Sequence, residues 1–146
     1  MSRRKARENA FLMIFEAAYH ENGYYEILLT NTDKEKPEVE YTVECVRGVF
    51  EHISEIDAFI SDHSIKWKNE RISKVSLAIL RLALYEMLFG KTVEKVIAIN
   101  EAVELAKLYS EDESPGFINA ILGGIAKTLN GALHHETDGS ERNNAE

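Results

Sequence analysis

The sequence predicts an all-α fold, and three observations lead to this prediction. Apolar residues recur at intervals of three and four positions rather than in alternation along the chain. Only two prolines and eight glycines interrupt the 146 residues. The central stretch from Ile72 to Phe89 contains neither of these residue types, as expected of an unbroken helix.

The first predicted helix begins close to the N-terminus. Ser2 is a suitable N-cap. Gly23 is predicted to end this helix, because glycine is common where helices stop. The apolar residues between them fall on one stripe at helical spacing: Phe11, Ile14, Phe15 and Ala18. A short second helix is predicted over residues 24–29, and a polar loop follows over 30–37.

The middle of the chain predicts one long helix and one central helix. A regular apolar rhythm predicts a single third helix from Val39 to Asp62. Residues 64–71, which include Trp67, are predicted to form an irregular connection or one short turn. The stretch from Ile72 to Phe89 is apolar on nearly every side, and such a helix is expected at the centre of a fold.

Two further helices complete the predicted domain. Gly90 is predicted to end the central helix, and the next helix runs from about Val96 to Tyr109. Ser114-Pro115 predicts the start of the last helix, since a capping hydroxyl is followed by a proline that needs no backbone donor. Apolar content falls after Gly131. We therefore expect one domain over residues 1–131 and a disordered acidic tail over 132–146.

Charge is distributed unevenly along the chain. The net charge of −8 argues by itself against a nucleic-acid-binding protein, which is usually basic. The first 20 residues nevertheless carry four cations against two carboxylates, a net charge of +2. We call these cations the basic cluster: Arg3, Arg4, Lys5 and Arg7. On charge alone, the cluster is equally well explained as a phosphate-binding site and as a solvated helix start.

The sequence contains no recognisable catalytic, cofactor or metal motif. The single cysteine, Cys45, cannot form an internal disulfide, which suits a reducing cytoplasm. No histidine follows a glutamate at the spacing that di-iron bundles use, and no phosphate-binding glycine loop is present. No apolar run approaches the length of a membrane span. We therefore expect a soluble cytoplasmic protein that is not an enzyme and has no cofactor.

Three side chains in the helical stretches could have a role outside the core. Asn100 and Asn119 lie in otherwise apolar helices, where an amide must find hydrogen-bonding partners. A core or boundary position explains them better than a ligand contact. Phe117, just inside the last helix, could belong to the core or could stack on an unpaired base.

Four sequence blocks resemble one known family. They are RRKARE at residues 3–8, AILRLALYE at 78–86, AINEAVELAK at 98–107, and SP with FIN at 114–119. In this order and spacing they resemble the NusB family of bacterial transcription antitermination proteins. The resemblance spans nearly the whole chain and implies a NusB-like fold of about seven helices in two packed helical bundles.

The resemblance also implies a function and a set of partners. Members of this family bind boxA, a short single-stranded element in leader and ribosomal RNA transcripts, together with the ribosomal protein NusE. They form part of an RNA polymerase antitermination complex and are not catalysts. The residues that this implies for RNA binding are Arg3, Arg4, Lys5, Arg7, Glu113, Ser114, Phe117 and Asn119. Those implied for the NusE contact are Phe15, which replaces a frequent tyrosine, and Ser76, which replaces a common acidic residue.

Three other interpretations remain open at the level of sequence. The chain could be a protein-binding helical module, or a homodimer, without specific RNA recognition. It could resemble the helical RNA-binding appendage of a ribosomal RNA methyltransferase, although it leaves no room for a cofactor-binding fold. An unrecognised hydrolase is supported only by scattered acidic residues.

Overall fold

The fold is described from a computed structural model. It describes residues 2–30, 32, 37–64 and 72–145, with side chains up to residue 130 apart from that of residue 37. Within this part of the chain there are seven helices and no strand, which confirms the all-α prediction. The helices are α1 (Arg3–Ala17), α2 (Tyr24–Thr30), α3 (Pro37–Glu51), α4 (Ile53–His63), α5 (Lys74–Leu88), α6 (Lys95–Tyr109) and α7 (Ser114–Ala145).

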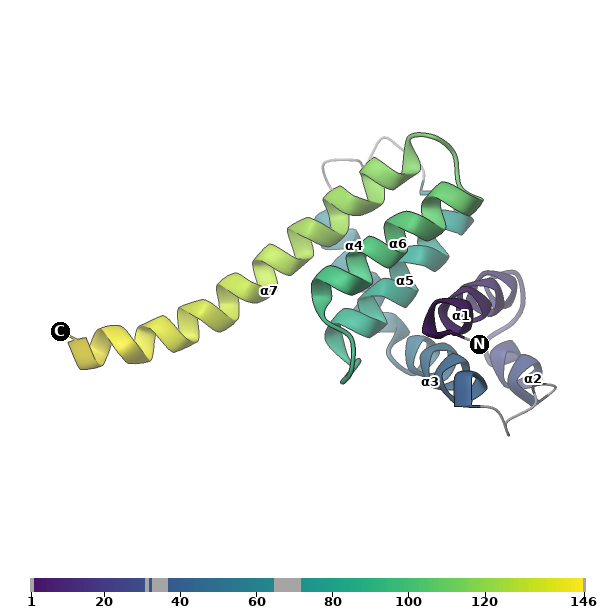
Figure 1. The fold of residues 1–146 in the computed structure, drawn as a ribbon, viewed down its shortest axis with the longest axis horizontal. Helices are drawn as coiled ribbons and strands as arrows, with labels where there is room; N and C mark the ends of the chain where they lie inside the picture. The colour runs from purple at the N-terminus through teal and green to yellow at the C-terminus, as the bar shows by residue number, and fades with distance from the viewer. Residues whose placement is uncertain (1, 31, 33–36, 65–71, 146) are drawn as a thin grey trace.

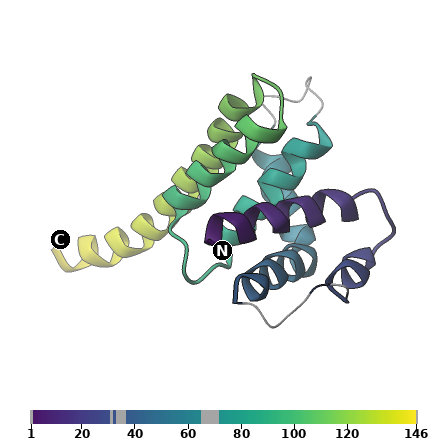
Figure 2. The ribbon, with the colours of Figure 1, turned by 45° about the vertical axis from the view of Figure 1, so that its right-hand side comes forward.

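The helices pack in two groups around α5 (Figures 1 and 2). In one group α1 packs on α2 and α3, and in the other α6 packs along α7, with α4 beside α7. Helix α5 contacts α1, α3, α4, α6 and α7. Its fully buried side chains include Ile79, Leu80, Leu82 and Leu84, which lie on several sides of the helix. The prediction that this helix is central is therefore confirmed.

The predicted single helix from Val39 to Asp62 is wrong, because the chain bends at His52. The backbone of His52 leaves the helical region, with φ −112° and ψ 21°, and separates α3 from α4. The imidazole of His52 stacks on the ring of Phe89 at the end of α5, with centroids 3.8 Å apart. The bend lets both α3 and α4 pack against α5. The apolar rhythm continues through the bend, so the spacing of apolar residues does not predict it.

The helix ends agree only partly with the predictions. The hydroxyl of Ser2 accepts a hydrogen bond from the Lys5 backbone N–H at 3.2 Å, which confirms Ser2 as the N-cap of α1. Helix α1 ends at Ala17, earlier than predicted. Gly23 instead lies in the turn before α2, with a φ of 91° that favours glycine. Helix α7 begins at Ser114, as predicted.

The C-terminal part of α7 runs past the packed helices (Figure 1). The backbone there is helical to Ala145, where the sequence predicts a disordered tail over 132–146. The side chains of that range lie outside the described residues. Among the residues that are described, no helix is both long and apolar enough to span a membrane.

Candidate nucleic-acid interface

Three cations of the basic cluster lie exposed on the first turn of α1. The side chains of Arg3, Arg4 and Lys5 are all exposed. No acidic residue lies in this first turn. The N-terminal backbone N–H groups of a helix carry partial positive charge. Cationic side chains and backbone donors are therefore gathered at one end of α1.

Arg7, which is also predicted to bind RNA, does not lie on this exposed surface. Its side chain is only 4% exposed and is held by Glu86 of α5, which is 1% exposed. Arg7 Nε donates to both carboxylate oxygens at 2.9 and 3.0 Å, and Nη2 donates at 2.9 Å. Arg7 thus connects α1 to α5 inside the protein.

The guanidinium of Arg7 keeps its charge in this buried pair. Burial works against the charge of Arg7, but hydrogen bonds and the charge of Glu86 outweigh it and raise the pKa of Arg7. The hydroxyl of Tyr41, on α3, also donates to Glu86. Burial raises the pKa of Tyr41, so its hydroxyl keeps the proton that it donates. The carboxylate of Glu86 is therefore bonded from both α1 and α3.

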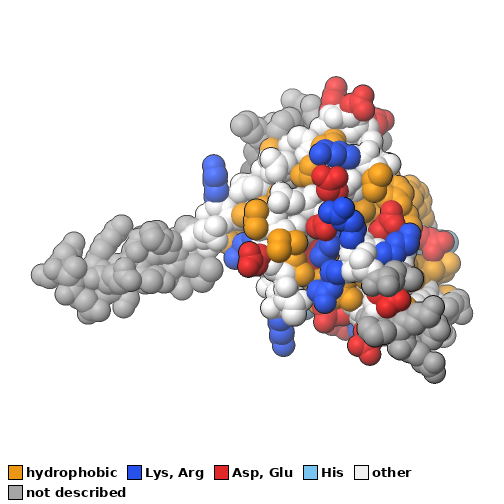
Figure 3. All heavy atoms as spheres, viewed as in Figure 1, with side chains coloured by type: hydrophobic (Ala, Val, Ile, Leu, Met, Phe, Trp, Pro, Cys, Tyr) orange, Lys and Arg blue, Asp and Glu red, His pale blue; other side chains and the backbone are white. Residues whose placement is uncertain are grey.

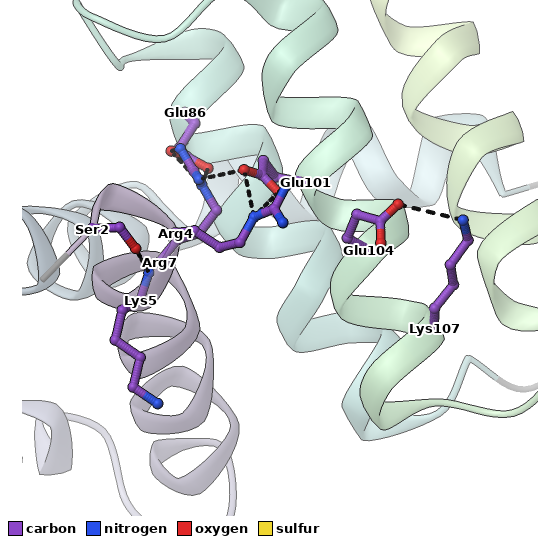
Figure 4. A network of polar contacts seen from close by, with 8 residues as sticks. All are labelled: Ser2, Arg4, Lys5, Arg7, Glu86, Glu101, Glu104 and Lys107. Atoms are coloured by element: carbon purple, nitrogen blue, oxygen red, sulfur yellow. Dashed lines mark hydrogen bonds and ion pairs between the residues drawn. The ribbon is translucent and has the colours of Figure 1, made fainter.

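Arg4 is held by a second carboxylate, Glu101 of α6 (Figure 4). Arg4 Nε lies 3.2 and 3.1 Å from the two oxygens of Glu101, and Nη2 lies 3.1 Å from Oε2. Arg7 Nη1 reaches the same carboxylate at 3.3 Å. The Arg4 side chain is 71% exposed, whereas that of Glu101 is 15% exposed. Glu101 is thus shared between one exposed and one buried arginine.

Arg3 contacts neutral groups. Its guanidinium carbon lies 3.8 Å from the centre of the Tyr41 ring, within cation–π range. Arg3 Nη1 also donates to the hydroxyl of Thr92 at 3.0 Å. Among the described residues, no carboxylate lies within ion-pair distance of Arg3.

Lys5 is paired within its own helix. Lys5 Nζ lies 2.9 Å from Glu8, and the hydroxyl of Tyr109 on α6 donates to the other Glu8 oxygen at 2.7 Å. Hydrogen bonds from Lys5 and Tyr109 lower the pKa of Glu8. Basic and acidic side chains are consequently interspersed in a band over α1 and α6 (Figure 3).

Predicted RNA-binding residues at and just before the start of the last helix line a cavity of about 650 Å³ between α5, α6 and α7. Glu113, Ser114 and Phe117 line it together with Ser76, which is predicted to contact the partner protein. Tyr109 lines the same cavity. The structure thus brings predicted RNA-binding and partner-binding residues into one place, and Tyr109 connects that place to α1 through Glu8.

Asn119 lies apart from this cavity. Its side chain and that of Asn100 are both exposed, so neither amide needs partners in the core. Asn100 lines a groove beside Arg4 and Glu101, whereas Asn119 lines neither that groove nor the cavity at Phe117. Asn119 therefore lies outside both of these hollows.

Phe15 lies in a groove on α1 with exposed apolar neighbours. Leu12 and Tyr19 line the same groove, and their side chains are 41% and 55% exposed. Lys74 of α5 lies 4.1 Å from the centre of the Tyr19 ring. On α6, Leu108 is 71% exposed. Apolar surface of this kind is typical of contacts with another protein.

Sequence reasoning missed the two carboxylates that organise the cluster. Glu86 and Glu101 both lie inside the blocks at residues 78–86 and 98–107. Each is separated from its arginine by more than 75 positions in the chain. The one available signal was Glu86 within an otherwise apolar helix, because a buried carboxylate requires a cation.

Comparisons with known proteins give one consistent result. A family model described as the NusB family matches residues 4–127. Curated relatives described as transcription antitermination protein NusB include one from Clostridium novyi, 39% identical over 87% of this chain and 99% of the relative. One from Agathobacter rectalis is 43% identical over 86% of this chain and 100% of the relative. One from Bacillus subtilis is 38% identical, with coverages of 88% and 98%.

Solved structures agree with these matches. NusB of T. maritima superposes with a TM-score of 0.74 at 36% identity, covering 87% of this chain and 92% of that one. A crystal structure of antitermination factors NusB and NusE in complex with dsRNA matches with a TM-score of 0.71 at 30% identity, covering 86% and 96%. From its sequence blocks, its helical fold and these comparisons, the chain belongs to the NusB family.

Proposed function

We propose that this protein is a transcription antitermination factor that binds single-stranded boxA RNA in leader and ribosomal RNA transcripts together with NusE. It would act in the cytoplasm as part of an RNA polymerase antitermination complex, with no catalytic step of its own. The observation that carries the proposal is the exposed group of Arg3, Arg4 and Lys5 at the N-terminus of α1. The family membership and the solved NusB–NusE–dsRNA complex support it.

In this proposal the cations bind the RNA backbone and do not read its sequence. Phosphate oxygens match both the guanidinium groups and the free N–H groups of a helix N-terminus. With Arg7 buried, three cations remain for phosphates. For single-stranded RNA, each neutralised phosphate contributes about −0.7 to the slope of log K for RNA binding against log salt concentration. Three phosphates therefore predict a slope of about −2.

Base selection is assigned to the start of α7. Phe117 is partly buried and packs against the core with part of its side chain. It shares its cavity with Glu113 and Ser114, which could accept hydrogen bonds from base edges. Stacking of one base on an aromatic ring contributes about 1–3 kcal/mol. We propose that Phe117 supplies the selectivity that the cations lack.

The partner surface is assigned to the neighbouring face. Phe15 and Ser76 would contact NusE, with exposed Leu12 and Tyr19 adding apolar area on α1. The net charge of −8 favours association with a basic ribosomal protein. Complementary charge of this kind raises the association rate more than the final affinity.

The proposal is tested by titrating labelled boxA RNA and a scrambled RNA with the protein, alone and with NusE. We expect tighter binding of boxA than of the scrambled RNA when NusE is present. R3Q/R4Q should weaken binding to both RNAs. The matched control is R47Q on α3, whose arginine pairs with Glu26 at 3.6 Å and lies outside the cluster. Equal affinity for both RNAs in the presence of NusE would overturn the proposal.

The exposed apolar side chains on α1 and α6 favour a second candidate function, a protein-binding module or homodimer without specific RNA recognition. In that case Leu12, Tyr19 and Leu108 would pack on a second copy. Light scattering after size exclusion, with and without boxA RNA, separates the two. A dimer that binds neither boxA RNA nor NusE supports this candidate over antitermination.

A further inference from the structure

We infer that Glu101 limits the RNA affinity of this protein by holding Arg4 in the absence of RNA, so that a phosphate must compete with its carboxylate. The inference rests on the proposed function, because it concerns the same RNA-binding surface. In this inference a residue of α6, Glu101, controls how readily a cation of α1, Arg4, binds RNA. The basis is the geometry shared by Arg4, Arg7 and Glu101 (Figure 4).

The contact of Arg4 with Glu101 uses the donors that a phosphate would need. Nε and Nη2 of Arg4 lie 3.1–3.2 Å from the two oxygens of Glu101. The same guanidinium nitrogens are the groups with which an arginine binds phosphate oxygens. Because the Arg4 side chain is 71% exposed, an RNA strand can reach it. The carboxylate and the phosphate would therefore compete for the same donors.

Glu101 is also held by a buried arginine, Arg7. The Glu101 side chain is 15% exposed, and Arg7 Nη1 donates to it at 3.3 Å from the interior. The charge of Arg7 is already balanced by Glu86, with three hydrogen bonds of 2.9–3.0 Å. Glu101 is thus not needed to neutralise Arg7. Its negative charge remains to be balanced by Arg4.

Replacing Glu101 with glutamine should therefore tighten RNA binding. An exposed ion pair contributes about 0.2–1 kcal/mol, which corresponds to about a 1.4- to 5-fold change in affinity. E101Q removes this competition and also removes a negative charge close to the bound phosphates. We expect about a 2- to 5-fold gain in boxA affinity at low salt. The salt slope should stay near about −2, because Arg4 is already one of the three cations that bind phosphates in the complex.

A neighbouring carboxylate provides the matched control. Glu104 lies one turn further along α6 and pairs with Lys107 at 3.4 Å, not with a residue of α1 (Figure 4). E104Q changes the net charge by the same amount as E101Q. If the effect is specific to Arg4, E104Q should gain clearly less affinity. The gain from E101Q should also vanish in the R4Q/E101Q double variant when it is compared with R4Q.

The experiment measures boxA affinity with NusE present, over a series of salt concentrations, for the wild type and these variants. Thermal unfolding of each variant checks the fold. If E101Q unfolds early, E101D keeps the charge but draws the carboxylate back from Arg4, and it should show part of the gain.

A wild type that is folded but fails to prefer boxA over scrambled RNA overturns the proposed function. A wild type that prefers boxA, with no gain in E101Q and E101D, overturns the inference alone. An equal gain in E104Q, or one that persists without Arg4, also overturns it.

Discussion

Arg7 of α1 and Glu86 of α5 form a buried ion pair, with three hydrogen bonds of 2.9–3.0 Å from the guanidinium to the carboxylate. The two residues are 79 positions apart in the sequence. The Tyr41 hydroxyl donates to the same carboxylate from α3. The pair therefore fixes how α1 lies across α5, and with it the direction in which the exposed cations of α1 point.

Removing one member of this pair should destabilise the fold strongly. R7M leaves the carboxylate of Glu86 buried without its cation, and such a loss costs about 3–5 kcal/mol. The double variant R7M/E86L should recover much of this loss, because neither charge then remains buried. Denaturant unfolding followed by circular dichroism measures both effects.

The control for this prediction is R4M, which breaks an exposed ion pair on the same helix. R4M should lower the free energy of unfolding by no more than about 1 kcal/mol. If R7M and R4M lower the free energy of unfolding by the same amount, Arg7 would have to be exposed in solution, and its placement in the interior would be contradicted.

Gly48 of α3 should not tolerate a side chain. A Cβ at this position would overlap the ring of Tyr85, which is 7% exposed on α5. G48A should therefore destabilise the protein by about 1–3 kcal/mol through overpacking. The matched control is G123A in α7, where a Cβ would meet nothing within 4 Å. The free energy of unfolding of G123A should be higher than that of the wild type by about 0.5–1 kcal/mol, since alanine is the better helix former. Equal effects of the two variants in urea unfolding would contradict the close approach of α3 to α5.

The features that the sequence predicted well depend on local chemistry. Ser2 caps α1 through a backbone N–H only three residues away. Helix α7 begins at Ser114, beside a proline of the kind that is common in the first helical turn. The central position of α5 follows from its own composition, which leaves no polar face for solvent. Each signal lies within about one helical turn or within one helix.

The features that the sequence missed depend on contacts between distant residues. The bend at His52 contains neither glycine nor proline, and it is stabilised where His52 stacks on Phe89. Arg7 and Arg4 have the same side chain in the same helix, yet one is buried and the other exposed. The difference arises because Arg7 faces Glu86 across the packed interface with α5. Sequence spacing predicts that a cation lies on a helix, but it does not predict which carboxylate lies opposite that cation.

The ion pair at Glu8 should make stability depend on pH in the acid range. Hydrogen bonds from Lys5 and Tyr109 lower the pKa of Glu8 below its usual value of 4.5. A carboxylate with a lowered folded pKa stabilises the fold above its unfolded pKa, and this contribution is lost as pH falls through the folded value. The difference in unfolding free energy between wild type and E8Q should be constant at neutral pH and shrink below about pH 4.5.

Unfolding of both proteins across a pH series measures this difference. Y109F, which removes the hydroxyl donor but keeps the ring, should show the same trend with a smaller amplitude. A difference between wild type and E8Q that stays constant through the acid range would contradict the described bonding of Glu8.

The helix after residue 131 should be dispensable for folding and for RNA binding. We propose the domain boundary at this position because the last buried core residue described on α7 is Ile125, with Leu129 packed against the core beyond it. A chain of residues 1–131 should therefore keep its unfolding free energy to within about 0.5 kcal/mol, as for changes at a surface. Its affinity for boxA RNA with NusE should stay within about twofold of the full chain.

A chain of residues 1–120 serves as the control and should fail to fold, because it lacks Ile121, Leu122 and Ile125. Circular dichroism and the RNA titration measure both truncations, and a loss of boxA binding in the folded 1–131 chain would place part of the RNA-binding surface beyond the proposed boundary.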